Sequence, residues 1–212
     1  TNLNPVIRWD RRDDSEGDTI LTLIYISSDG ASWQLERTTA DTEAYLGNTV
    51  QFQRGRIYYV SLRNFDGYNY SPLSDSVYFR LNNLPRTPYN LSSPGYNVLT
   101  VRPVIKWAGY DADGDSILTQ VFTNGIYELS TYDTVAVLGN TVPMSSGETY
   151  YYRLRSYDGY EWSSYSDTVF FHLNTPPLKP QGSTDLGMHV YTLPPQVSWT
   201  PGGADPDGDT VY

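Results

Sequence analysis

GRIYYVSLRNFDGYNYSPLSDSVYFRLN, residues 55–82, returns without a gap as GETYYYRLRSYDGYEWSSYSDTVFFHLN at residues 147–174. The offset of 92 residues holds for residues 46–85 against 138–177, where 21 of 40 positions are identical. Self-similarity over such a period predicts a tandem of structural units. In each copy, two runs rich in Tyr, Val and Phe flank an Asp-Gly turn, and this pattern predicts a pair of antiparallel strands.

A second set of markers extends the repeat toward the N-terminus. Tryptophan ends the segments NPVIRW, RPVIKW and PPQVSW at spacings of 98 and 92 residues, and an acidic loop follows each of them. A unit of this length is the size of one β-sandwich domain. We therefore predict units at residues 1–83, 84–175 and 176–212, with Pro-rich linkers at 82–88 and 174–180.

The composition of the chain indicates an all-β fold. No long stretch follows a helical period, whereas Tyr, which favours strands, fills 20 of 212 positions. Glycine at 17 positions and proline at 14 supply turns between short strands. The expected strands are 6–9, 20–26, 33–35, 57–63 and 76–81 in the first unit, and 104–107, 117–122, 149–155 and 168–173 in the second.

Charge and cysteine content exclude several classes of function. The formal net charge is −10 and no run is rich in Lys or Arg, so we expect no nucleic-acid partner. The chain has no cysteine, which excludes a disulfide framework, a thiolate nucleophile and a cysteine-based metal centre. No apolar run approaches the length of about 20 residues that a membrane span needs. We therefore expect no membrane span in this segment.

Four motifs make the chain similar to a known family. The segments NTPPLKP (174–180), PPQVSW (194–199), DPDGDTVY (205–212) and GETYYYRLRSYDGYEWS (147–163) resemble the fibronectin type III-like modules of bacterial and archaeal surface and secreted proteins. The resemblance covers the whole chain and implies tandem immunoglobulin-like β-sandwiches in an extracellular or cell-surface protein. It also implies a buried core tryptophan on one strand and a tyrosine corner, and the matching residues are Trp9, Trp107, Trp199, Tyr58 and Tyr150.

Both ends of the chain carry incomplete units. Only Thr1–Asn4 precede the first Trp-marked strand, so we expect the first unit to lack most of its first strand. The third unit is expected to hold only its first strands, and the chain is expected to be an excerpt of a longer array. The alternative is that the C-terminal segment completes a neighbouring subunit by strand donation.

Three acidic loops are the candidate metal sites. In each loop, three acidic residues alternate around a glycine bend, a pattern that favours convergence on one hard cation such as Ca²⁺. Backbone carbonyls or a neighbouring repeat would complete its shell of roughly six to eight oxygens. The alternative is a plain turn in which Asp side chains cap local N–H groups. The candidate ligands are Asp14, Glu16 and Asp18, then Asp111, Asp113 and Asp115, then Asp205, Asp207 and Asp209. Arg11 and Arg12 stand beside the first loop and make it the weakest candidate.

Aromatic residues follow both Asp-Gly turns. Tyr68 and Tyr70 follow one turn, and Tyr160 and Trp162 follow the other. Loops at such an end of a sandwich bind partners, and aromatic rings stack on sugars. The alternative is that these rings pack against the short strand expected at 33–35, or its equivalent, or against the next repeat. The four residues are candidate contacts to a ligand or partner.

Two sequons are candidate glycosylation sites. They are Asn69-Tyr70-Ser71 and Asn90-Leu91-Ser92. Asn90 is the favoured acceptor because Asn69 stands in a tight turn.

The sequence shows no catalytic set. The two histidines are His172 and His189, and His172 is expected on the surface because Arg80 stands at its equivalent position. No Ser–His–Asp set, phosphate-binding loop or metal-binding His pair can be assembled, so we expect no enzyme. The expected function is a structural module array of an extracellular surface protein, in a surface layer, sheath, filament or stalk, with neighbouring repeats or copies of itself as partners. The alternative is an adhesin, or a carbohydrate-binding or spacer module of a secreted glycan-active enzyme, which would bind a cell-surface glycan or protein.

Overall fold

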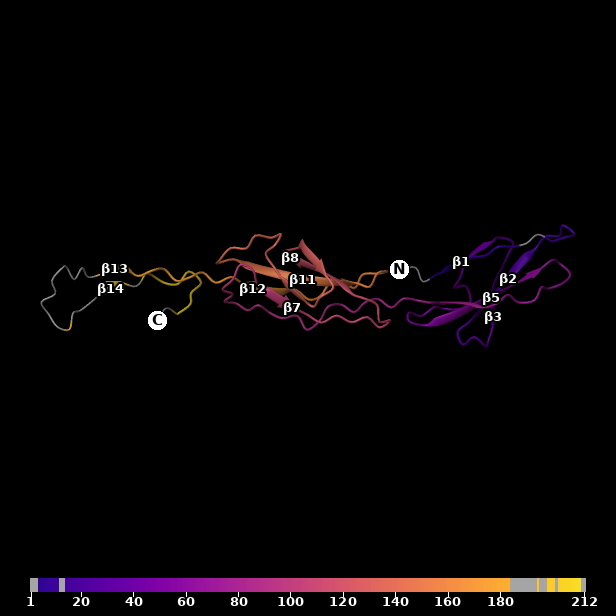
Figure 1. The fold of residues 1–212 in the computed structure, drawn as a ribbon, viewed down its shortest axis with the longest axis horizontal. Coiled ribbons are helices and arrows are strands. Elements are labelled where there is room, and N and C mark those ends of the chain that lie inside the picture. The colour runs from indigo at the N-terminus through magenta and orange to yellow at the C-terminus, as the bar shows by residue number, and fades with distance from the viewer. Residues whose placement is uncertain (1–3, 12–13, 184–193, 195–197, 201, 211–212) are drawn as a thin grey trace. The chain divides into compact units, whose positions relative to one another are not determined.

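The computed structural model describes residues 4–11, 14–183, 194, 198–200 and 202–210. It divides the chain into two compact units, Thr1–Asn83 and Leu84–Tyr212, and Figure 1 shows strands and loops in both. The described residues contain no helix long and apolar enough to cross a membrane. Residues 176–212 fall within the second compact unit, and their separation as a third repeat stays a prediction.

The first unit is a sandwich of two antiparallel sheets. The smaller sheet pairs β1 (Val6–Arg8) with β4 (Glu43–Tyr45), and the larger has the order β3 (Gln34–Thr39), β2 (Leu21–Ser27), β5 (Ile57–Phe65), β6 (Val77–Arg80). The central ladder joins β2 to β5, from Leu21 opposite Phe65 to Ser27 opposite Tyr59. The central strand β2, with the apolar run LTLIYIS, is the most buried strand of this unit.

The second unit repeats this architecture. Its smaller sheet pairs β7 (Val104–Lys106) with β10 (Val135–Val137), and its larger sheet has the order β12 (Val169–His172), β11 (Thr149–Tyr157), β8 (Leu118–Thr123), β9 (Ile126–Thr131). The chain before β7 pairs twice with the sandwich, where Tyr89 bridges to Ala108 and Val98 to Leu173. A further two-stranded sheet joins β13 (Gln181–Ser183) to β14 (Trp199–Thr200).

Each sandwich buries its own hydrophobic core between its sheets. Along β11, the alternate residues Tyr150, Tyr152 and Leu154 are buried, as the two-residue period of a strand requires. Each large side chain that is fully buried contributes about 1.5–3 kcal/mol to folding. The first core gathers Ile24, Ile26, Ala44, Leu46, Phe52, Tyr58 and Val60, and the centre of the second gathers Ile105, Val121, Leu138, Tyr152, Leu154, Phe171 and Leu173.

The strand tryptophans do not share one environment. Trp107 is 5% exposed and lies in the second core, and Trp9 packs against the first core from a half-buried position. Trp199, in contrast, is 65% exposed, so the prediction that it is a core residue is wrong for the structure described. Its strand pairs only with β13, and among the described residues no second sheet covers that pair.

Tyr58 and Tyr150 have the geometry of tyrosine corners. Both side chains are buried, with 2% and 8% exposure. The hydroxyl of Tyr58 accepts the N–H of Gln53 at 2.9 Å, and that of Tyr150 accepts the N–H of Ser145 at the same distance. In each sandwich this bond ties the start of the long central strand to the loop that precedes it.

The two identical LGNTV segments each surround a buried glutamate that the sequence reasoning did not single out. Glu36 is 4% exposed and Glu128 is 5% exposed. Burial opposes ionisation of Glu36, but hydrogen bonds from the loop outweigh it and hold the pKa of this carboxyl below its usual range. Backbone N–H groups donate to the carboxylates from Gly47, Asn48 and Thr49 at 2.5–3.0 Å, and from Gly139, Asn140 and Thr141 at 2.8–3.3 Å.

The strands differ from the predicted set at the sheet edges. β3 covers Gln34–Thr39 rather than 33–35, and its counterpart β9 was not predicted. The three-residue strands β4 and β10 were missed as well. A register shift interrupts the pairing of β2 with β3 and of β8 with β9. Such a bulge breaks the alternation on which strand prediction depends.

Candidate functional site

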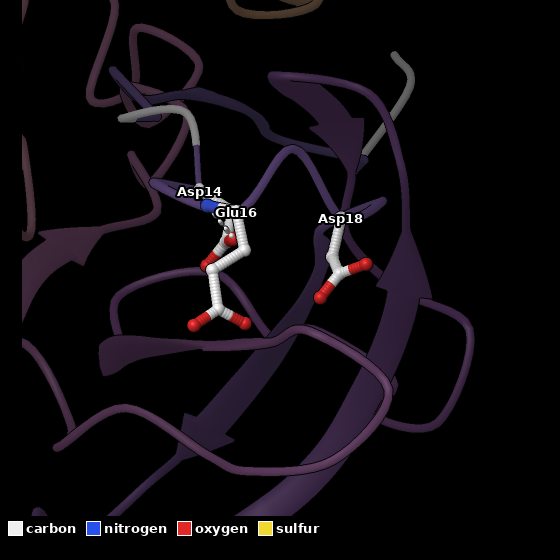
Figure 2. Close-up of side chains that lie close together, drawn as sticks. All are labelled: Asp14, Glu16 and Asp18. Carbon is white, nitrogen blue, oxygen red and sulfur yellow. Dashed lines mark hydrogen bonds between the residues drawn. The ribbon is translucent and has the colours of Figure 1, made fainter.

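The first acidic loop brings its three carboxylates together. Asp14, Glu16 and Asp18 each offer one oxygen, and these oxygens lie within 4.8 Å of one another. Figure 2 shows the three side chains turned to the same side of the loop. The Oδ1 atom of Asp14 also accepts the N–H of Glu16 at 2.7 Å, so the cluster is built on a turn.

Arginine beside the first loop is tied to the backbone. The Arg11 guanidinium donates to the carbonyl oxygen of Ile20 at 3.1 Å and to that of Ala40. It therefore connects the base of the acidic loop to the turn between β3 and β4. Arg12, the other arginine of the prediction, lies outside the described residues.

The second acidic loop has the same cluster and a buried carboxylate. One oxygen each from Asp111, Asp113 and Asp115 lies within 4.8 Å of the others. Asp111 is 6% exposed, and its Oδ1 accepts the N–H of Asp113 at 2.7 Å and that of Asp115 at 3.3 Å. Its Oδ2 is buried and accepts no hydrogen bond. Asp111, Asp115 and Asp133 line an open hollow of ≈ 410 Å³ beside this loop.

The third acidic loop keeps the turn but not the cluster. Asp205 Oδ1 accepts the N–H of Asp207 at 2.9 Å and that of Asp209 at 3.4 Å, as in the second loop. Among the described residues, however, the three carboxylates do not gather as they do in the other two loops. The side chain of Asp207 turns instead to Thr175 and His172, at the end of the second sandwich.

All three acidic loops contain the hydrogen bonds that the turn interpretation predicts. In each loop the first Asp accepts a backbone N–H from two residues further along the chain. Glycine follows with a φ of +82° to +83° in each of the three loops, a conformation that disfavours other residues. Binding of Ca²⁺ by any of the loops stays a prediction.

The outer aromatic of each Asp-Gly turn is exposed. Tyr68 is 81% exposed and Tyr160 is 72% exposed. The turns that carry them are rigidly capped. Asp66 Oδ1 accepts the N–H groups of Tyr68 and Asn69, and Asp158 Oδ1 accepts the equivalent pair in the other turn, all at 2.6–2.7 Å. Bonds from Asn69 and Tyr68 lower the pKa of Asp66.

The inner aromatic of each turn packs against its own sheet. Tyr70 stacks on Phe65 with ring centroids 4.5 Å apart, and the Arg63 guanidinium lies 4.2 Å from the Tyr70 centroid. The second sandwich repeats this stack at 4.7 and 4.3 Å with Trp162, Tyr157 and Arg155. Stacks of this kind contribute about 0.5–2 kcal/mol. Of the four candidate contact residues, the structure therefore presents the faces of Tyr68 and Tyr160 to a ligand more openly than those of Tyr70 and Trp162.

Both sequons present an exposed asparagine. Asn69 and Asn90 are exposed, and Asn90 has a φ of +52°. The serine hydroxyls are already engaged, since Ser71 accepts the N–H of Asn64 at 2.9 Å and Ser92 accepts that of Lys106 at 2.8 Å. Glycosylation of either asparagine stays a prediction.

His172 is buried, and the expectation of a surface histidine is wrong. It is 8% exposed and stacks on Tyr96 with ring centroids 5.0 Å apart. Its Nδ1 lies 3.0 Å from Thr149 Oγ1 and its Nε2 lies 3.3 Å from Asp207 Oδ1. The loop after β14 brings Asp207 to this histidine, and the position of Arg80 in the first repeat gave no indication of that contact. His189 lies outside the described residues.

Comparisons with known proteins find similarity among solved structures. No family model matches the chain, and no curated protein matches it. Among the solved structures with a similar fold are the chicken CNTN1 FN1-FN3 domains, at 11% sequence identity and a TM-score of 0.49. That match covers 82% of this chain and 62% of the CNTN1 chain, so this chain spans less than two thirds of the length of the CNTN1 chain. The described residues form antiparallel β-sandwiches, so the all-β fold class predicted from the sequence is confirmed.

Proposed function

We propose that this chain is a non-catalytic structural module array of an extracellular surface protein, part of a surface layer, sheath, filament or stalk. The supporting observation is that residues identical in the two repeats make their contacts within their own sandwich. The positions that are identical in the two repeats include the tyrosine corners, the turn aspartates and the stacked arginines, and each makes its contacts inside its own sandwich. These residues build the module.

An arrangement among the described residues that resembles a catalytic set supports the same proposal. Thr149, His172 and Asp207 form a chain of contacts of 3.0 and 3.3 Å. The His172 ring is covered by Tyr96, and Asp207 is also held by Thr175. A general base needs an accessible nucleophile beside a cleft that admits substrate. A buried ring between two structural partners fits a joint better than a reaction centre.

The exposed surface supports contacts between copies of the protein. Tyrosine combines a large apolar ring with a polar hydroxyl, which suits surfaces that form reversible or regular contacts. Among the described residues, ten tyrosines are exposed: Tyr45, Tyr68, Tyr70, Tyr78, Tyr96, Tyr110, Tyr127, Tyr132, Tyr160 and Tyr165. Neighbouring repeats, or copies of the chain, are the partners that this proposal implies.

Electron microscopy of the native parent protein tests the proposal. Ordered filaments, tubes or sheets, or stalks that end in a separate head, are the expected images. A globular enzyme in which these sandwiches surround a catalytic domain would contradict it.

An adhesin, or a carbohydrate-binding or spacer module of a glycan-active enzyme, is the second candidate, and the exposed Tyr68 and Tyr160 favour it. Both rings stand on rigid turns, as a sugar-stacking platform requires. Saturable binding to insoluble polysaccharide that is lost in Tyr160→Ala would support this candidate. Tyr96→Ala is the matched control, because Tyr96 is 73% exposed and stacks on His172, at the opposite end of β11 from the turn. Equal binding by both variants would refute the proposed sugar-stacking role of Tyr160.

A further inference from the structure

The end of the second sandwich presents hydrogen-bond donors that hold a carboxylate. His172 closes β12, and its ring is held on one face by Tyr96 and at Nδ1 by Thr149. Backbone bonds hold the same corner, because His172 N–H donates to Gly95 at 3.3 Å and Val98 N–H donates to His172 at 3.0 Å. With the ring held by these contacts, Nε2 lies 3.3 Å from Asp207 Oδ1.

Asp207 fills this site from 35 residues further along the chain. Its Oδ1 lies 3.3 Å from His172 Nε2 and accepts the Thr175 hydroxyl at 3.2 Å, and its Oδ2 accepts the Thr175 N–H. The side chain of Asp207 is only 7% exposed. A carboxylate removed from water is costly unless it is paired and hydrogen-bonded, so Asp207 and its three donors depend on one another.

Hydrogen bonds within the acidic loop hold the backbone that carries the Asp207 side chain. Asp205 accepts the N–H groups of Asp207 and Asp209 and the Gly208 N–H through its carbonyl at 3.0 Å. The backbone also passes close to the linker, since a Cβ on Gly202 would stand 2.3 Å from the Lys179 carbonyl oxygen and 2.4 Å from that of Leu178. Only glycine allows this approach, so the linker and the acidic loop are packed together as one joint.

We propose that Asp207, the middle carboxylate of the DPDGD loop, is a latch that fixes the joint between the second sandwich and the repeat segment that follows it, with His172 and Thr175 as its receptor. The partner is the acidic loop of the next repeat in the chain. This inference rests on the proposed function, because a fixed joint serves an array. It also explains why the third loop, unlike the other two, does not gather its carboxylates.

Electrostatics supports a joint that depends on the ionised carboxylate. The Thr175 N–H and the His172 ring lower the pKa of Asp207, with the Thr175 bond as the largest cause.

Distance measurements between spin labels test the latch in the full chain. The chain has no cysteine, so Ser164→Cys and Ala204→Cys place two unique labels at exposed positions on the two sides of the joint. The parent is expected to give one narrow distance distribution. Asp207→Asn is expected to broaden it about twofold, because one carbonyl oxygen cannot serve all three donors.

Matched variants separate the latch from general charge effects. Asp209→Asn removes the same charge from the same loop and is expected to leave the distribution narrow, whereas Thr175→Val is expected to broaden it partly. His172→Phe keeps a ring on Tyr96 but removes the donor, and adding Asp207→Asn to it is expected to cause little further broadening. An unchanged ¹H–¹⁵N spectrum for residues 104–172 verifies that the sandwich is folded.

Two results would overturn the latch. One is an equal distribution in the Asp207→Asn and Asp209→Asn proteins, whether both are narrow or both broad. The other is a distribution that is already broad in the parent. Neither result concerns assembly, so filaments or stalks in the micrographs together with a loose joint would refute the latch and leave the proposed function standing.

Discussion

Removing the carboxylate of Glu128 is expected to destabilise the second sandwich strongly. The side chain is 5% exposed and accepts N–H groups from Gly139, Asn140 and Thr141 at 3.3, 3.2 and 2.8 Å. Glu128→Ala leaves these three donors without an acceptor inside the loop. Glu128→Gln keeps one oxygen but loses the charge and turns an NH₂ group toward backbone donors.

The size of the effect follows from the number of donors. A buried donor left unsatisfied costs about 1–3 kcal/mol, and part of that is recovered when water enters the relaxed loop. We therefore expect Glu128→Ala to lower the free energy of unfolding by about 3–5 kcal/mol and Glu128→Gln by about 1–2 kcal/mol. For a domain of this size, 3 kcal/mol corresponds to a fall in Tm of at least about 12 °C.

Hydrogen exchange of the full chain in increasing urea measures this change for each sandwich separately. Peptides from the first unit provide an internal reference, since only the second unit is expected to lose protection at lower urea. Glu148→Gln is the matched control, because Glu148 is exposed and the substitution removes the same charge. If Glu128→Gln and Glu148→Gln unfold at the same urea concentration, the buried carboxylate does not support the loop and the reasoning fails.

Three further predictions follow from single contacts. Tyr152→Phe removes the hydroxyl that donates to the Ser92 carbonyl at 2.6 Å and is expected to cost about 1 kcal/mol in urea unfolding; because burial raises the pKa of Tyr152 to about 12, one fewer late-ionising tyrosine in an alkaline absorbance titration should accompany it. Acid is expected to weaken the first sandwich through Glu36: its folded pKa is depressed, so its contribution is complete above the usual value of 4.5 and is lost as pH falls through the folded pKa, and Glu36→Gln should flatten this part of the stability profile. If the second acidic loop binds Ca²⁺ as its sequence predicts, Ca²⁺ raises the Tm and Asp111→Asn abolishes the rise while Asp209→Asn does not; an identical melt in excess chelator contradicts the site.

The central strand pairs were predictable because their signals are local. In residues 147–174, alternation of buried and exposed positions continues through β11, and the Asp-Gly turn places β12 beside it. The three-residue strands β4 and β10 have no such signal. Each is recognised only by its pairing with a strand that is far away in sequence, Val6–Arg8 or Val104–Lys106.

In the strand that carries the buried glutamate, hydropathy predicts the wrong residues to be buried. In β3, Leu35 is 47% exposed while Glu36 is 4% exposed, and in β9 Tyr127 is 46% exposed while Glu128 is 5% exposed. The register shift beside these positions turns the acidic residue inward and its apolar neighbour outward. The repeat made the LGNTV loops conspicuous, but their role depends on a glutamate that lies outside the motif.

The acidic loops show the same limit at the candidate site. Asp14, Asp111 and Asp205 make the same capping bond to the N–H two residues ahead, and that part follows from the Asp and Gly spacing alone. The other carboxylates depend on what stands opposite. Those of the first two loops gather with their neighbours, whereas Asp207 meets a histidine and a threonine that the strand β12 and its exit place in front of it. The same acidic-loop motif therefore allows two arrangements of its carboxylates. The residues that lie opposite the loop determine which arrangement forms.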